Sequence, residues 1–509
     1  MKRLKKWTAM VLAVILMMSM SVAAMAAGGN HTITINNSVS GHSYAAYQIF
    51  KGDLADDGTL SNIEWGSGVN GADLLAALQA ADSDTYGQCN NAADVVNILA
   101  KSGEHDNLTA KAFAEIAAEH TKGNGSSGTY NEITHNYTIT GLEDGYYLIR
   151  DTAAVTGADA QTEYILTVTN DTEVTPKSDV PESQKKVKDA NDTTGIVSGW
   201  QDSADYDIGD SIPFQLTATL PDNYSEYKTY TMTFHDKEAA GLDFQKDTVK
   251  VYVGENPTPI DSDLYNIQEN TADQCTFEIT IPDVKNIPDV TDSSVIRVEY
   301  ESDLNDQAVI GSAGNRNTMY LTYSNNPYGY ETGTTPVDTV IVFTYQTIIH
   351  KKDEKNETLN GATFTLEKEI KGETGNSWET VGTVTGTDTS VFTFTGLDDG
   401  NYRLTETKAP DGYNTMEPVL FTVMATHDTD TDSDGVHNLS ELTGNVEDGV
   451  IQFTSNVIDG SLTAYIQNFP GSILPGTGGR GTTVFYIVGI ALVAGAAAII
   501  TVRIKKARR

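Results

Sequence analysis

Short segments of alternating apolar and polar residues run from about residue 181 to residue 470. They constrain the fold more than any other feature, and Gly, Pro, Asn and Asp recur between them. A period of two places successive side chains on opposite faces of a strand, so each segment can bury one face. Many short strands punctuated by turn residues are typical of β-sandwiches. We therefore predict two all-β modules in tandem, over residues 179–345 and 346–471.

The N-terminal module, residues 27–178, has a mixed pattern. Strand-like segments flank three segments with helical spacing of apolar residues, at 73–81, 92–101 and 111–120. A connector rich in Pro, Ser and Lys follows at residues 175–181. The predicted fold class is mainly β, with tandem immunoglobulin-like β-sandwiches behind a mixed α+β N-terminal domain.

Charge and cysteine content narrow the choice of partners. The chain has 33 Lys and Arg against 70 Asp and Glu, a formal net charge of −37. Such a surface repels nucleic acid and anionic lipid, so we expect neither as a partner.

Cys89 and Cys275 fall in different predicted domains and are too few for a disulfide framework. Two buried free thiols are the favoured interpretation, and an interdomain disulfide is the alternative.

Both ends of the chain resemble export and sorting signals. Residues 1–26 have a basic start, a short apolar stretch and an Ala-Met-Ala site, as in a secretory signal peptide. Near the other end, an uncharged run at 483–502 is long enough to span a bilayer, and a basic tail follows it. Residues 472–509 resemble the LPxTG cell-wall sorting signal of Gram-positive surface proteins through Leu474, Pro475, Gly476, Thr477 and Gly478.

This resemblance implies that the chain becomes covalently attached through its C-terminal region. A sortase cleaves the bond between Thr477 and Gly478 and passes the Thr477 carbonyl to an amine. The precursor would be held in the membrane only transiently, and the product would be extracellular and attached to the cell wall.

Residues 402–413, YRLTETKAPDGY, match the Y-x-L-x-E-T-x-A-P-x-G-Y "E-box" of pilins and collagen-adhesin B-type domains. Alternation places Glu406 on one face with Tyr402 and Leu404, where burial favours the neutral form of the acid. In the resembled family this acid assists a bond between a Lys on the first strand and an Asn on the last. The matching residues here are Lys351 and Asn468. The resemblance thus implies an isopeptide bond, and a buried Lys–Glu ion pair is the alternative.

The middle module carries a looser version of this pattern. Its lysine-rich start, an inward-facing Asp and an Asn near a later strand end resemble the middle domains of backbone pilins. We predict an isopeptide bond between Lys185 and Asn325, assisted by Asp236. The register is uncertain by one residue, so Lys186 and Asn326 remain alternatives.

The first module echoes the third but lacks a lysine. Residues 141–152 align with residues 396–407, which places Asp151 in the position of the acid. Residues 32–38 contain no Lys. We therefore predict no isopeptide bond in the N-terminal module.

Thr175-Pro176-Lys177 in the connector resembles the end of the pilin motif, whose Lys is the polymerisation nucleophile. The Trp of that motif and its usual Tyr before Pro are missing here. Lys177 is our candidate, its rivals are Lys185, Lys186 and Lys188, and the alternative is a solvated linker lysine.

One acidic loop fits a calcium-loop pattern, D-x-D-x-D-G-x5-E, and its flanks are strand-like instead of helical. A surface loop rich in Asp is the alternative to a Ca²⁺ site, and we expect no other cofactor. The ligands would be Asp430, Asp432, Asp434 and Glu441.

Together these resemblances imply the backbone subunit of a sortase-assembled pilus on a Gram-positive bacterium, with a role in adhesion. Its partners would be pilus-type and housekeeping sortases, identical subunits, peptidoglycan and, for adhesion, a host receptor. The chain would not be an enzyme, apart from forming its own isopeptide bonds. A monomeric cell-wall-anchored adhesin is the alternative, and a secreted enzyme is a third class that no motif supports.

Overall fold

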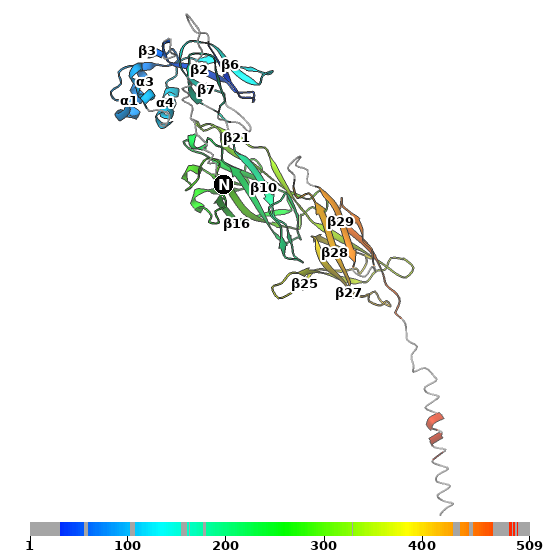
Figure 1. Cartoon of the computed structure of the whole chain (residues 1–509). Helices are drawn as coiled ribbons and strands as arrows, with labels where there is room; N and C mark the ends of the chain where they lie inside the picture. The colour runs from blue at the N-terminus through cyan, green and yellow to red at the C-terminus, as the bar shows by residue number, and fades with distance from the viewer. Residues whose placement is uncertain are drawn as a thin grey trace, which may run out of the picture.

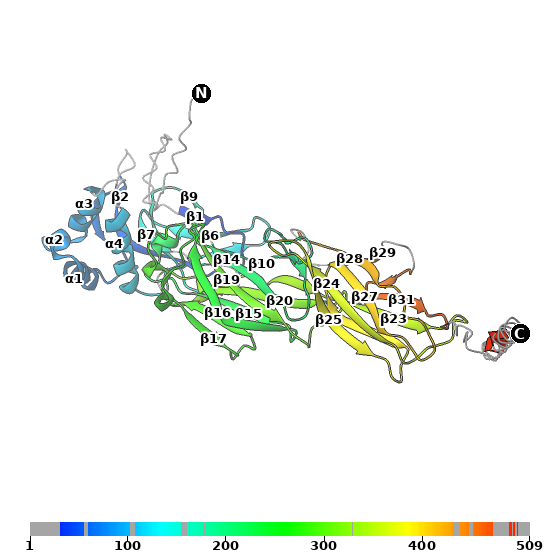
Figure 2. The same cartoon turned by 90° about the horizontal axis from the view of Figure 1, so that it is seen from below.

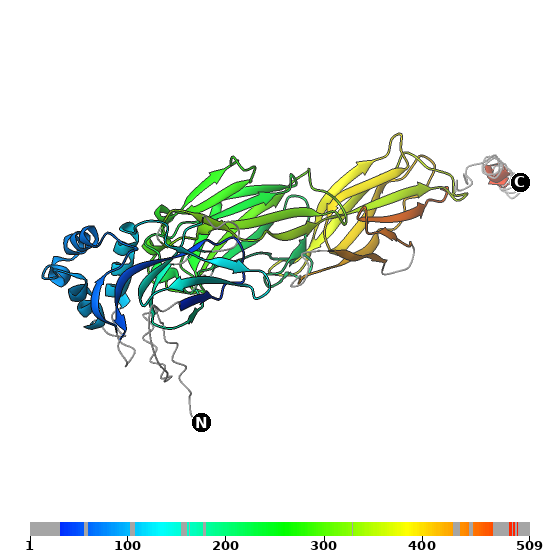
Figure 3. The same cartoon turned by 90° about the horizontal axis from the view of Figure 1, so that it is seen from above.

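The computed structural model places three β-rich domains end to end in an elongated row (Figures 1 and 3). It describes residues 31–54, 60–101, 107–153, 160–161, 163–176, 180–327, 329–430, 438–446, 451–471, 488–490, 492–493 and 496. The predicted fold class is confirmed, because strands dominate the two later domains and the helices gather in the first one. The helical domain lies at one end of the row (Figure 2).

The N-terminal domain combines two sheets with a helical cap. Its elements are β1 (His31–Ile35), β2 (Tyr44–Leu54), β3 (Leu60–Trp65), α1 (Gly71–Ala81), α2 (Ser83–Tyr86), α3 (Ala92–Lys101), α4 (Asn107–Glu119), β4 (Ser126–Ser127), β5 (Thr129–Asn131), β6 (Asn136–Leu142), β7 (Gly145–Asp151), β8 (Glu163–Val168) and β9 (Thr172–Val174). The sheets have the orders β5-β6-β1-β9 and β3-β2-β7-β8. Leu74, Leu78 and Phe113 from the helices form one apolar cluster with Phe50 and Leu148 of the second sheet. The three predicted helical segments are thus confirmed as α1, α3 and α4.

The middle domain is a sandwich of two sheets with its core between them. Its elements are β10 (Glu182–Val187), β11 (Ala190–Asn191), β12 (Ile196–Val197), β13 (Ser203–Asp205), β14 (Ser211–Thr219), η1 (Tyr224–Glu226), β15 (Met232–Glu238), β16 (Leu242–Val253), η2 (Ser262–Leu264), β17 (Asn266–Glu269), β18 (Phe277–Ile281), η3 (Val284–Asn286), β19 (Val295–Leu304), β20 (Asn315–Ser324), β21 (Thr332–Thr334) and β22 (Asp338–Phe343). One sheet has the order β10-β14-β19-β16 and the other β13-β22-β20-β15-β18-β17, with β21 beside β20. Alternate residues of facing strands, such as Phe214, Phe234 and Val298, are fully buried.

The C-terminal domain is a second sandwich, in which the first and last strands are neighbours. Its elements are β23 (Tyr345–Lys352), β24 (Thr363–Ile370), β25 (Ser377–Thr385), β26 (Val391–Leu397), β27 (Gly400–Lys408), β28 (Val419–His427), β29 (Leu439–Val446), β30 (Thr454–Asn456) and β31 (Ser461–Gln467). The sheets have the orders β26-β23-β31-β30 and β25-β24-β27-β28-β29. β23 and β31 run parallel, with Lys351 opposite Ile466 (Figure 2).

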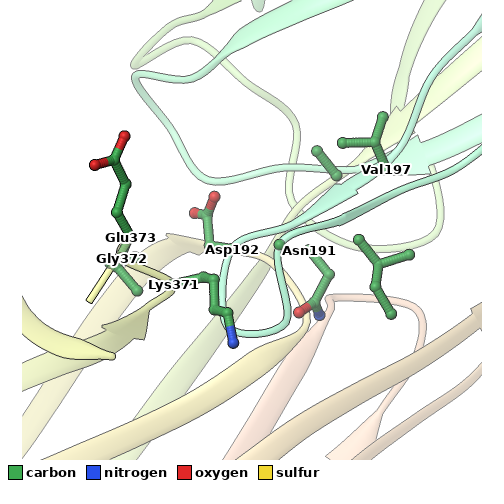
Figure 4. A pocket seen from close by; sticks show the side chains of 10 residues that line it. Asn191, Asp192, Val197, Lys371, Gly372 and Glu373 are labelled. Carbon is green, nitrogen blue, oxygen red and sulfur yellow. The ribbon is translucent and has the colours of Figure 1, made fainter. Parts of the chain in front are cut away.

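A buried charge network joins the middle and C-terminal domains. Lys368 on β24 is 2% exposed and its ammonium contacts three carboxylates, Asp192 at 2.9 Å, Asp207 at 2.5 Å and Asp398. Nearby, Lys371 donates its backbone N–H to the Asp192 carbonyl at 2.8 Å. An open pocket of about 440 Å³ lies between these loops, with Asp192 and Lys371 on its wall (Figure 4). The contacts tie the β11–β12 hairpin to the C-terminal domain.

This junction is expected to lose stability as the pH rises. Burial, and then the charge of Asp399 or Asp207, raises the pKa of Asp189 and Asp210 to about 6, while Asp205 is raised well above its usual range by burial and Asp189. The folded state therefore binds more protons than the unfolded state above about pH 4. Deprotonation of Asp189 and Asp210 should lower the stability of the folded state from about pH 4 to pH 6. Deprotonation of Asp205 should lower it further above pH 6.

The measurement is thermal unfolding of the mature chain at pH 5 and pH 7.5. Asp205→Asn should flatten the decrease in melting temperature, because the amide has no proton to lose. Asp263→Asn, at an exposed position, is the matched control. An unchanged pH profile in Asp205→Asn would contradict the assignment.

No helix within the described residues is long and apolar enough to cross a bilayer. The predicted signal peptide lies outside the described residues. So does the predicted span at 483–502, except for residues 488–490, 492–493 and 496.

Candidate functional site

The predicted lysine, acid and asparagine of the C-terminal domain meet in its core. Lys351 lies near the end of β23, Asn468 follows β31 in the same sheet, and Glu406 lies on β27 in the opposite sheet. Their exposures are 0%, 2% and 4%, respectively. β23 and β27 bury every second residue, and Lys351 and Glu406 occupy such buried positions.

The three side chains are in direct contact. The Lys351 ammonium lies 2.5 Å from Asn468 Oδ1 and 3.1 Å from Glu406 Oε1. The Asn468 amide donates to Glu406 Oε1 at 2.9 Å and to Oε2 at 3.0 Å, and the Met416 backbone N–H donates to Oε2 at 2.9 Å. The carboxylate therefore touches both the amine and the amide nitrogen.

The surroundings favour a reactive amine at Lys351. Burial lowers the pKa of Lys351, although the charge of Glu406 opposes this shift. The Phe364 ring centroid lies 5.2 Å from the amine. A neutral amine has a lone pair for nucleophilic attack, and the adjacent amide carbonyl is a suitable electrophile.

The middle domain also buries the predicted lysine and acid together. Lys185 on β10 and Asp236 on β15 are both 0% exposed, and the Lys185 ammonium hydrogen-bonds Asp236 Oδ2. The Tyr300 hydroxyl on β19 accepts from Lys185 at 2.8 Å and donates to Asp236 Oδ2 at 3.0 Å. Burial lowers the pKa of Lys185 and raises that of Asp236, in each case against the charge of the partner.

The predicted partner Asn325 does not belong to this cluster, which is a correction. The Lys185 backbone N–H donates to Asp338, and Asp338 pairs with Met319 on β20. Asn325 follows β20 six residues further on, about 20 Å along an extended chain. Its carbonyl accepts from the Gln161 N–H at 2.7 Å, at the boundary with the N-terminal domain.

Asn317 is the amide beside the middle lysine. It lies on β20 two residues before Met319, is 0% exposed, and its Nδ2 donates to the Tyr300 hydroxyl at 2.9 Å. Its Oδ1 is buried and has no hydrogen-bond partner among the described residues. Sequence reasoning missed Asn317, although it precedes Met319 and Leu321 in the same inward series. Three asparagines, Asn315, Asn317 and Asn325, fit that series, and the pattern does not say how far each lies from Lys185.

The two register alternatives lie outside this core. The Lys186 ammonium pairs with Asp202 at 2.5 Å, and its side chain is 25% exposed. Asn326 is half-buried and donates to Glu331 at 2.8 Å. A shift of one residue turns a side chain to the opposite face, so the structure selects Lys185 over Lys186.

A further acid faces the middle site. Burial, and then the charge of Asp236, raises the pKa of Glu238 to about 8. Its Oε1 accepts from Ser302 at 2.5 Å and from Asn317 at 3.3 Å. Sequence reasoning also missed this residue, because the alternation gives no measure of distance across the sandwich.

The N-terminal domain places a histidine beside its acid. His42 Nδ1 lies 2.5 Å from Asp151 Oδ2, and both side chains are fully buried. The Ser43 backbone N–H also donates to Asp151. Asp151, at the acid position of the internal repeat, is therefore paired with a histidine instead of a lysine.

The structure describes only some of the remaining predicted residues. Cys89 and Cys275 are free and buried in different domains, as in the favoured interpretation. Asp430 and Glu441 are exposed. Several predictions fall outside the described residues, so these remain predictions: Lys177, Leu474, Pro475, Gly476, Thr477, Gly478, Asp432 and Asp434.

Comparison with known proteins relates this architecture to pilins. Residues 345–437 match the model of the SpaA prealbumin-like fold domain. The Trypsin-resistant surface T6 protein of Streptococcus pyogenes serotype M6 is 26% identical over 389 residues, 65% of this chain and 70% of that protein.

Solved structures agree at the level of the fold. The T6 backbone pilin of serotype M6 Streptococcus pyogenes, a modular three-domain structure, has a TM-score of 0.54 at 17% identity. The alignment covers 88% of this chain and 100% of that one. The full-length major pilin SpaD of Corynebacterium diphtheriae has a TM-score of 0.49 at 16% identity, over 87% and 98% of the chains. The chain thus contains a SpaA prealbumin-like domain and shares its three-domain fold with the T6 backbone pilin.

Proposed function

We propose that the chain is the backbone subunit of a covalent, sortase-assembled pilus on the surface of a Gram-positive bacterium. Internal Lys–Asn isopeptide bonds would stabilise the subunit. The observation that carries the proposal is the contact of Lys351, Glu406 and Asn468 between the first and last strands of a domain. Similarity to the T6 backbone pilin supports it.

The proposed bond-forming step needs no outside reagent. The neutral amine of Lys351 attacks Cγ of Asn468, and a new N–C bond forms. The C–Nδ2 bond then breaks and ammonia leaves. Neutral Glu406 gives its proton to the leaving nitrogen and takes one from the attacking amine, both of which it contacts. Lys185, Asp236 and Asn317 would react in the same way in the middle domain.

The placement of this bond suits a fibre under tension. Force enters the C-terminal domain at the start of β23 and leaves after β31. A Lys351–Asn468 bond would carry the force from one strand to the other, because it joins their adjacent C-terminal ends. Residues 352–467 would then lie off the loaded path and could not be unfolded by pulling.

We assign polymerisation to Thr477 of one subunit and Lys177 of the next. The structure weakens the rivals. Lys185 is fully buried, Lys186 is paired with Asp202, and the Lys188 ammonium lies 4.5 Å from the centroid of the Trp200 ring. The last subunit would pass Thr477 to a peptidoglycan amine through the housekeeping sortase.

Coexpression with a pilus-type sortase tests polymerisation. Wild-type chains should give a ladder of covalent multimers in a denaturing gel, and Lys177→Arg should give monomer only, because guanidinium is a poor nucleophile. Lys188→Arg is the matched control and should keep the ladder.

Two outcomes would contradict the assignment. A ladder that persists in Lys177→Arg and disappears in Lys188→Arg would move the nucleophile to Lys188. Surface-attached monomers without any multimers would favour the alternative, a monomeric wall-anchored adhesin.

A further inference from the structure

Three potential metal ligands meet on the outer face of the middle domain, away from the buried lysine. His235 lies on β15, and Asp273 and Cys275 lie in the turn between β17 and β18. One ligand atom from each lies within 4.8 Å of the other two. Imidazole, carboxylate and thiolate are the ligand types that Zn²⁺ prefers.

The spacing of the donor atoms is suitable for a shared ion. His235 Nδ1 lies 2.9 Å from Asp273 Oδ2, and Cys275 Sγ lies 3.3 Å from the same oxygen. Adjacent ligands of a tetrahedral Zn²⁺ are roughly 3.3–3.7 Å apart, given Zn–N and Zn–S bonds of about 2.0 and 2.3 Å. The Glu278 carboxylate, 3.3 Å from His235 Nδ1, is in range to be a fourth ligand.

Contacts with other residues already orient the His235 and Asp273 side chains. His235 Nε2 lies 3.0 Å from the Thr322 hydroxyl, which leaves Nδ1 for a metal, and its ring stacks on Tyr320 at 4.4 Å. The Thr271 hydroxyl hydrogen-bonds the other oxygen of Asp273. Zinc sites commonly fix their ligands in this way, through a hydrogen bond on the far side of each one.

The site is also open to an ion from solution. The side chains of Asp273 and Glu278 are 33% and 20% exposed, and that of His235 is 13% exposed. Without a metal, the Cys275 thiol can donate to Asp273. Zinc would replace that proton, which leaves to solvent as the Zn–S bond forms.

We propose that His235, Asp273 and Cys275, with Glu278 in reach, form a Zn²⁺ site that ties the turn at residues 270–276 to β15. The turn contains two non-glycine residues with positive φ, Asn270 at 51° and Gln274 at 69°. An ion bridging the turn to the sheet would hold this unfavourable backbone in place.

Titration of the reduced, metal-free mature chain with Zn²⁺ alone, against a chromophoric chelator, tests the proposal. We expect one site per chain, with weaker binding at pH 6 than at pH 8, because the thiol must lose its proton. Cys275→Ser should weaken binding at least tenfold, and Cys89→Ser, at the other buried thiol, should not change it.

Spectroscopy keeps the test valid if Cys275→Ser folds poorly. Co²⁺ added to the Cys89→Ser chain should give the near-ultraviolet charge-transfer band of a cobalt–thiolate bond, and Zn²⁺ should abolish it. Zn²⁺ should also slow the reaction of Cys275 with a thiol reagent. Lack of the Co²⁺ band, or Zn²⁺ binding unchanged in Cys275→Ser, would overturn the proposal.

Discussion

Glu406→Gln is expected to leave the C-terminal domain without its cross-link, so that the mature chain weighs about 17 Da more than the doubly linked product, apart from the substitution itself. The carboxylate contacts the amine and the amide nitrogen, and glutamine cannot shuttle a proton between them. Intact-mass measurement of the purified chain, compared with the mass calculated for each sequence, decides the result.

The same variant should be much less stable. The bond would close a loop across 117 residues, and a cross-link over about 100 residues stabilises by about 5 kcal/mol through the entropy of the unfolded chain. For a domain of this size, the melting temperature should fall by on the order of 15 °C. Glu367→Gln removes a carboxylate from the surface pair with Arg403 and is the matched control. If the wild-type mass agreed with its own sequence, with no ammonia missing, bond formation would be contradicted.

Asn317→Ala is expected to remove the cross-link of the middle domain, and Asn325→Ala is expected to keep it. Asn317 hydrogen-bonds the tyrosine that Lys185 contacts. Asn325 lies about 25 Å from Asn317 along an extended chain. After correction for the substitution, only Asn317→Ala should gain about 17 Da. Peptide mapping should show a branched peptide that joins Lys185 to Asn317 in the wild type.

This pair of variants separates the two assignments directly. A branched peptide containing Asn325 would restore the assignment made from sequence. If both variants still lacked the mass of one ammonia for the middle domain, neither asparagine would be the partner. Because Asn317→Ala also deletes a buried hydrogen-bond donor, Asn317→Asp is a second test. Aspartate would lose water instead of ammonia, about 18 Da, if it still reacts with Lys185.

For the C-terminal site, alternation predicted which side chains point inward, and the resemblance to the E-box family named three of them as a set. There, Lys351, Glu406 and Asn468 each extend an inward series of apolar residues, and a twelve-residue motif marks the acid. Burial follows from the period of two, because a strand has only two faces. The same reasoning identified Lys185 and Asp236 as inward residues of the middle domain.

Sequence periodicity determined which side chains of this protein point inward, and sequence motifs are the whole basis for the export and sorting signals that we predict at its termini. Only the tertiary structure decided which inward side chains meet. Asn317 and Asn325 are equivalent in a pattern of period two. Yet Met319 pairs with Asp236 and Asp338, both of which hydrogen-bond Lys185, so Asn317 lies near the lysine and Asn325 lies beyond it. The Lys368 junction and the His235–Cys275 cluster likewise join residues from separate segments. Periodicity is a local property of one strand, whereas distance across a sandwich depends on how the sheets pair and pack.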